Sequence, residues 1–150
     1  MKFLLLLLSQ VWQPLPTAEA ATHCLAQNIY FEARNISIDS KVAVSWVTFN
    51  RVNHEKFPNS ICEVVYQPKQ FSWYWDGKAD TPGTNILEQK AWAESKLIAN
   101  NFIMSCKFGY GECPQDNTQR ALFYHREDVT PYWTEYFYET TKIDNHIFYN

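Results

Sequence analysis

The sequence lacks the features that mark several large classes of protein. Its 150 residues include four glycines, and no repeat, low-complexity tract or Gly/Ser linker interrupts the chain. It has no C-x-x-C and no H-E-x-x-H, so neither a zinc cluster nor a zinc-peptidase motif is indicated. Because the chain is also too short for two ordinary domains, we predict a single domain.

An excess of positive charge is also missing. Thirteen Lys and Arg residues face sixteen Asp and Glu residues, which gives a net charge of −3. A mildly acidic chain is not built to hold phosphate backbones. Neither nucleic acid nor an anionic membrane surface is therefore expected as a partner.

The N-terminus has the pattern of a secretory signal. Lys2 supplies a positive charge, and residues 3–8 form an apolar run that is short for a membrane span. Pro14 and Pro16 interrupt the run, and residues 18–20 read Ala-Glu-Ala, an A-x-A cleavage site. An uncleaved anchor and a buried N-terminal helix remain the alternatives.

The expected organisation is therefore a signal peptide at residues 1–20 and one mature domain at residues 21–150. Export would place the mature chain outside the cytoplasm, as a secreted, periplasmic or cell-wall protein. An even number of cysteines in an exported chain suggests two disulfides among Cys24, Cys62, Cys106 and Cys113. Three pairings are possible; Cys106–Cys113 would close an easy small loop, and Cys24–Cys62 would then tie the first helix to a later loop.

Hydrophobic spacing predicts helices first and strands last. Helices are expected at residues 22–34, capped by Thr22, at 39–53, capped by Ser37 or Asp39, and at 85–103, capped by Asn85. Residues 61–66 fit either a helical turn or a strand, and residues 67–83 a long loop. A strand at 121–125 and a hairpin of 136–143 with 146–149, turning at Asp144-Asn145, complete an α+β fold with a small antiparallel sheet.

The sharpest candidate for chemistry is Glu32, in the run Ile29-Tyr30-Phe31-Glu32-Ala33. A lone carboxylate among apolar side chains near the C-terminal end of a helix should have a raised pKa, because burial and the helix dipole both disfavour its charged form. Such an acid can donate a proton to a glycosidic oxygen. The structural alternative is a glutamate paired with Arg34 or Arg51.

Several segments, in order, resemble the cell wall hydrolase family typified by the spore-cortex-lytic enzyme SleB. They span about residues 24–149 and comprise residues 24–34 (CLAQNIYFEAR), 42–52 (VAVSWVTFNRV), 57–67 (FPNSICEVVYQ), 70–73 (QFSW), 121–125 (ALFYH) and 143–149 (IDNHIFY). Where related sequences usually carry glycine before the last histidine, this chain has Asp144-Asn145-His146. This departure is expected to change the turn and to leave the chemistry alone.

The resemblance implies a domain at residues 21–150 with a fold related to lysozymes and lytic transglycosylases. It also implies peptidoglycan glycan strands as the substrate and Glu32 as the essential acid. The residues expected to contact the glycan are Tyr30, Gln70, Ser72, Trp73, Tyr124 and His125. A monomer that needs no metal or cofactor is expected.

The mechanism is predicted from a missing residue. A hydrolase of the two-carboxylate type needs a second Asp or Glu across the scissile bond. No second carboxylate lies in an equally apolar motif; Asp39, Glu55 and Glu63 are the nearest candidates. A single acid suffices for a lytic transglycosylase, which cleaves the bond between N-acetylmuramic acid (MurNAc) and N-acetylglucosamine and leaves a 1,6-anhydro end.

Two rivals stay open. The first is a cysteine peptidase of peptidoglycan stems, with Cys24 at a helix start and His125 or His146 as base. The second is a glycan-binding module without activity, since aromatic clusters fit that function as well. A muramidase and, more remotely, a zinc amidase are variants of the enzymatic hypothesis.

Overall fold

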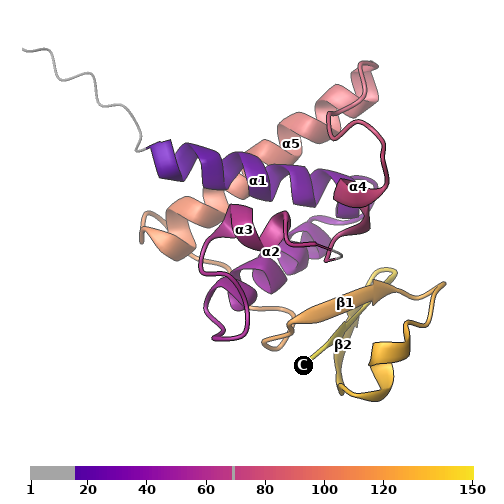
Figure 1. The fold of residues 1–150 in the computed structure, drawn as a ribbon. Helices are drawn as coiled ribbons and strands as arrows, with labels where there is room; N and C mark the ends of the chain where they lie inside the picture. Colours follow the sequence, from indigo (N-terminus) through magenta and orange to yellow (C-terminus); the bar gives the residue numbers. More distant parts are fainter. Residues whose placement is uncertain (1–15, 69) are drawn as a thin grey trace, which may run out of the picture.

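The computed structural model describes residues 16–68 and 70–150. The elements are α1 (Pro16–Ala33), α2 (Ile38–Val52), α3 (Ile61–Val65), α4 (Ser72–Trp75), α5 (Ile86–Phe102), the π-helical turn η1 (Ile103–Lys107), β1 (Phe123–Arg126), the 3-10 turn η2 (Tyr132–Glu135), β2 (Glu139–Ile143) and β3 (His146–Tyr149). The helices gather on one side and the sheet lies beside them (Figure 1). The predicted order of helices followed by a small antiparallel sheet is confirmed.

Helix α1 begins earlier than its sequence pattern predicts. Its first residue is Pro16, a residue type suited to the start of a helix because its missing N–H has no partner there anyway. Thr22 is therefore not a cap; its Oγ1 donates to the carbonyl of Ala18 at 2.9 Å, inside the helix. The predicted cleavage site after Ala20 consequently lies within α1, and most of the expected signal segment lies outside the described residues.

Helix α2 lies between the other helices and the sheet. Ser37 is its N-cap, as predicted, and the Ser37 Oγ accepts the backbone N–H of Ser40. Val44 joins the core formed with α1 and α5, while Ala43 and Val47 pack against the sheet residue Phe148. Burial on both sides explains why this helix is apolar around most of its surface.

The sheet has the order β1-β3-β2, with all neighbours antiparallel. The predicted hairpin turns at Asp144-Asn145, and Asp144 has a φ of 50°, in the left-handed region that tight hairpin turns require. In the register of β1 and β3, Tyr124 lies opposite Phe148 and Arg126 opposite His146. Residues two apart in a strand share a face, so Tyr124 and Arg126 point the same way.

Both disulfides have the suggested pairing. Cys24 bonds to Cys62 and joins α1 to α3, and Cys106 bonds to Cys113 across a short loop after α5. With Cys24 bonded and buried, the thiol that a cysteine peptidase would need is absent from this state of the chain. Within the described residues, no helix is long and apolar enough to span a membrane.

Candidate active site

Glu32 lies one residue before the end of α1, where the helix meets β1. The Tyr124 hydroxyl, on β1, donates a hydrogen bond to the Glu32 Oε2 at 3.1 Å. Glu32 is half-buried and lines two hollows in the surface. The helix thus positions one carboxyl group where it is partly shielded from solvent and still accessible.

The surroundings of Glu32 shift its proton affinity. Burial raises the pKa of Glu32 from 4.5 to about 7, although the Tyr124 hydrogen bond and the charges of Arg51 and Arg126 pull the pKa down. Burial, together with the neighbouring Glu32 charge, raises the Tyr124 pKa well above 10, so its hydroxyl stays a neutral donor. At neutral pH, Glu32 can therefore both hold and release a proton, as a general acid–base group must.

Arg51, on α2, is the cation buried behind Glu32. It is 3% exposed, and its Nε donates to the Leu122 carbonyl at 2.6 Å. Burial lowers the pKa of Arg51 to about 10, so the guanidinium remains charged at neutral pH. Its carbon atom Cζ lies 5.2 to 5.5 Å from the ring centres of Phe57, Phe71 and Phe123.

The structural alternative for Glu32 was an ion pair with Arg34 or Arg51. Within the part of the chain that the structure describes, no ion pair joins Glu32 to either residue. Arg34 instead pairs with Glu88 at 3.5 Å. Arg51 acts on Glu32 through its electric field, which leaves the carboxyl group able to exchange a proton.

Two hollows meet at Glu32. The polar hollow, of about 600 Å³, is lined by residues that include Arg34, Asn35, Ile36, Asp76, Lys78 and Asn145. The aromatic hollow, of about 780 Å³, is lined by residues that include Phe71, Phe123, Tyr124, Tyr132, Trp133 and Phe137. Glu32, Arg126 and His146 line both. A separate hollow of about 400 Å³ beside the Cys106–Cys113 loop contains none of the predicted substrate-contacting residues.

Four of the predicted contact residues line the aromatic hollow. They are Gln70, Ser72, Tyr124 and His125. The ring nitrogens of His125 already have partners, since Nε2 lies 3.0 Å from the Tyr149 hydroxyl and Nδ1 lies 2.7 Å from the Arg126 carbonyl oxygen. His125 therefore forms part of the wall and offers the hollow little free hydrogen-bonding capacity.

Trp73 lines the polar hollow but is almost fully buried. It is 7% exposed, stacks on Phe31 with ring centres 4.7 Å apart, and its Nε1 donates to the Asn28 Oδ1 at 3.0 Å. A ring this enclosed holds α4 against α1. Trp73, an expected glycan contact, therefore offers the polar hollow little exposed surface.

The structure does not bring Tyr30 to either hollow. Tyr30 is 1% exposed; its hydroxyl donates to Glu88 and accepts the backbone N–H of Gly83 at 3.1 Å. Two residues along a helix correspond to a rotation of roughly 200°, so the side chain of Tyr30 leaves α1 on the side away from Glu32. The expected substrate contact at Tyr30 is therefore replaced by a structural one.

Arg126 and His146 were not among the predicted contacts. His146 is 1% exposed, its Nδ1 has no hydrogen-bond partner, and its ring lies edge-on to Tyr124 at 5.1 Å. Burial and the Arg126 charge lower the His146 pKa, so the ring is neutral at pH 7. Strand alternation could have found Arg126, since it shares a face with Tyr124, but only the register of the sheet reveals that His146 lies beside it.

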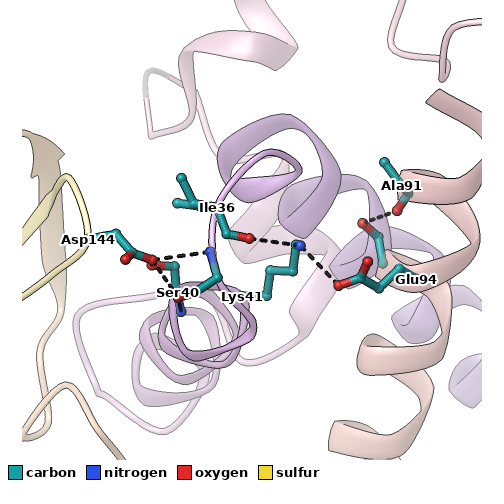
Figure 2. Close-up of polar contacts among 8 residues, drawn as sticks. Ile36, Ser40, Lys41, Ala91, Glu94 and Asp144 are labelled. Atoms are coloured by element: carbon teal, nitrogen blue, oxygen red, sulfur yellow. Dashed lines mark hydrogen bonds and ion pairs between the residues drawn. The ribbon is translucent and has the colours of Figure 1, made fainter. Parts of the chain in front are cut away.

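The loop between α1 and α2 is fixed from two sides, as Figure 2 shows. Lys41, buried on α2, donates to the Ile36 carbonyl and to the Glu94 carboxylate on α5, both at 3.0 Å. From the hairpin turn, Asp144 accepts the backbone N–H of Ser37 at 3.2 Å and the hydroxyl of Ser40 at 2.5 Å. Because this loop and the hairpin turn both line the polar hollow, these contacts hold its two rims together.

Among residues 16–68 and 70–150, no group of three or more His, Cys, Asp or Glu side chains is arranged to hold a metal ion.

The comparisons with known proteins all point to the same family. The model of a family described as Cell Wall Hydrolase matches residues 36–149, so Glu32 falls just before the matched region. The spore cortex-lytic enzyme of Bacillus subtilis is 28% identical over 125 residues, which cover 83% of this chain and 35% of that protein. The enzyme of the same name from Oceanobacillus iheyensis is 27% identical over 83% of this chain and 39% of that protein. The chain thus spans less than half the length of these relatives.

Two solved structures have a similar fold. The catalytic domain of the Bacillus cereus SleB protein superposes with a TM-score of 0.62 and 26% identity, covering 91% of this chain and 94% of that one. The catalytic domain of the germination-specific lytic transglycosylase SleB from Bacillus anthracis superposes with a TM-score of 0.63 and 26% identity, covering 92% of this chain and 100% of that one. The predicted fold, related to lytic transglycosylases, is confirmed.

Proposed function

The chain belongs to the cell wall hydrolase family, and on that premise we propose that it cuts the glycan strands of peptidoglycan with Glu32 as its catalytic acid. One observation carries the proposal: Glu32 lies where two hollows meet, with a pKa of about 7. A glycan strand that crossed both hollows would present a glycosidic oxygen to a carboxyl group that is partly protonated at neutral pH.

The proposed reaction is that of a lytic transglycosylase. Protonated Glu32 gives its proton to the bridging oxygen as the bond from that oxygen to MurNAc C1 breaks. The Glu32 carboxylate then takes the proton of the MurNAc C6 hydroxyl while that oxygen forms a bond to C1. The product is a 1,6-anhydro end, and Glu32 is protonated again without any water being consumed. While Glu32 is ionised, the Tyr124 hydrogen bond and the charge of Arg51 stabilise it.

A scarcity of suitable carboxylates supports a single acid. Within the described residues, Asp76 is the one carboxylate other than Glu32 that lines either hollow. Asp76 is exposed, and its Oδ1 accepts the backbone N–H of Lys78 at 2.9 Å, so it resembles a turn residue more than a poised base. If the reaction were hydrolysis instead, Asp76 would be the candidate for the second carboxylate.

Gln70 and Ser72 are the proposed polar contacts in the aromatic hollow. Both side chains line it, between rings that can pack against the apolar faces of sugars. We further propose that the enzyme acts as a monomer.

We also propose that the chain is exported and cleaved after Ala20, so that the mature enzyme acts at the cell wall. The N-terminal pattern of charge, apolar run and A-x-A site supports this proposal. An intact mass that corresponds to residues 21–150, measured on protein secreted from an expression host, is the expected result. A mass that retains residues 1–20 would refute cleavage.

The test of the function compares three proteins on purified peptidoglycan: the parent, Glu32→Gln and the control Glu55→Gln. Glu55 is exposed and lines neither hollow. Mass spectrometry of the released fragments should show anhydro-muropeptides from the parent and the control, and none from Glu32→Gln. Ordinary reducing ends would indicate hydrolysis and turn attention to Asp76. Intact glycan with all three proteins, together with tight binding, would favour the glycan-binding module.

A further inference from the structure

The two hollows that meet at Glu32 differ in chemistry. The aromatic hollow is walled mainly by rings, and its cations are the buried Arg51 and the shared Arg126. The polar hollow brings together the cations Arg34, Lys78 and Arg126. Apart from Glu32, the polar hollow holds one anion, Asp76. Arg51 is 3% exposed and lies among three aromatic rings, so the cations that belong to one hollow alone and face solvent, Arg34 and Lys78, lie in the polar hollow.

The three cations differ in how far they are already neutralised. Arg34 pairs with Glu88 at 3.5 Å, and Arg126 pairs with Asp128 at 2.7 Å. No carboxylate of the described residues pairs with Lys78, whose side chain is exposed at the rim. Its backbone is held by the Asp76 side chain, in the turn that follows α4. Lys78 is thus the cation most available to an incoming anion.

Peptidoglycan supplies anions on one part of its repeating unit. The sugar rings are uncharged and have apolar faces, and carboxylates are carried by the stem peptide attached to the lactyl group of muramic acid. We propose that the polar hollow binds carboxylates of the stem peptide while the aromatic hollow binds the sugar chain. This inference rests on the proposed function and adds a preference for strands whose stems are present and charged.

The expected effect is modest, because the ion pairs would be partly exposed to solvent. An exposed pair changes a binding constant by a factor of about 1.5 to 5, and two such pairs by about 2 to 25. The attraction should weaken with added salt, since the Debye length falls to about 3 Å at molar ionic strength. Sugar binding on aromatic rings should depend on salt much less.

The test compares soluble strands with native stem peptides to the same strands after their carboxylates have been converted to amides. The amide keeps the size of the stem and removes its charge. The parent should cut the native strands about threefold to tenfold more efficiently in kcat/KM than the amidated strands. Lys78→Gln should lower this ratio by about 1.5-fold to 5-fold, the effect of one exposed pair. The control Lys142→Gln removes a charge on β2, where Lys142 pairs with Glu127 outside both hollows, and should leave the ratio unchanged.

A ratio of one for the parent, or a ratio that Lys78→Gln leaves unchanged, would overturn the proposal. Strands stripped of their stems carry a lactyl carboxylate instead, and equal cleavage of these strands would overturn the assignment to the stem peptide. Calorimetry with Glu32→Gln and disaccharide-peptide fragments, native and amidated, measures the same preference without catalysis. A preference there, with no cleavage of any strand by the parent, would refute the proposed function and leave the polar hollow as an anion-binding site.

Discussion

Replacing Glu32 by Gln should stabilise the fold at alkaline pH. Gln has nearly the same size and can still accept the Tyr124 hydrogen bond, but it carries no charge. The wild-type carboxyl group must ionise where it is partly shielded from solvent, and this burial is the main reason why its pKa rises from 4.5 to about 7. At about 1.4 kcal/mol for each tenfold change in proton affinity, this rise corresponds to about 3 kcal/mol.

The sign of the effect follows from proton binding. Between pH 4.5 and about 7, folded Glu32 holds a proton that the unfolded chain has released. The free energy of unfolding of the parent therefore falls as pH rises through this window, and the Glu32 contribution to that fall is complete above about pH 7. Glu32→Gln lacks this contribution. The stability gap between the two proteins should open from near zero at about pH 4 to about 3 kcal/mol at about pH 8.5.

Urea unfolding, followed by fluorescence at a series of pH values, measures the gap directly. Glu55→Gln is the matched control, because it removes an exposed carboxylate and should show no comparable dependence. The cleavage rate of the parent should fall over the same pH range in which Glu32 loses its proton. A gap that stays constant with pH would show that Glu32 ionises normally, and the proposed acid would then lose its physical basis.

Three further changes have defined outcomes. Tyr124→Phe removes a hydrogen bond that lowers the Glu32 pKa, so the pH at which activity is half lost should move upward in a pH–rate profile. The pKa of Asp144 lies below its usual value because its carboxylate accepts hydrogen bonds from two serines. The stability that these bonds provide is therefore present above about pH 4 and is lost as pH falls through the lowered pKa. Asp144→Asn should be less stable than the parent in urea at pH 7 and equal to it in strong acid. Replacing Cys24 and Cys62 by Ala opens a link across 38 residues and should cost about 4 kcal/mol in thermal or urea unfolding, whereas a loss below about 1 kcal/mol would contradict the chain-entropy argument.

Features with a local signal were predictable from sequence. Ser37 and Asn85 cap their helices because a short polar side chain before an apolar run can reach the free N–H groups of the first turn. Glu32 stood out because its neighbours along the helix are apolar, and the structure places it at the meeting point of the hollows. The disulfide pairing was one of three possibilities and is the one observed.

Features that depend on tertiary packing were not predictable. Arg51 and His146 come from α2 and β3, and nothing in their own neighbourhoods shows that they converge on Glu32. Arg126, on β1, could be found only through the strand face that it shares with Tyr124. Tyr30 was expected at the substrate because it shares a motif with Glu32, but helix geometry sends the two side chains in different directions. Proximity in sequence was thus a poor guide to membership of the site.

The position of Arg51 explains why a buried glutamate can serve in both halves of the proposed reaction. Burial alone would raise the Glu32 pKa further, and the acid would then hold its proton too tightly to be regenerated as a base. The charge of Arg51, kept nearby but not in a direct ion pair, offsets part of that burial. Arg51→Met should therefore raise the Glu32 pKa above about 7 and slow the reaction at neutral pH. The pH–stability gap to the matching Glu32→Gln double variant should begin to open at the same pH as in the parent background, but it should continue to grow to higher pH and end at a larger value. A gap that levelled off at the same pH and the same size in both backgrounds would show that Arg51 only fills space between its three aromatic rings.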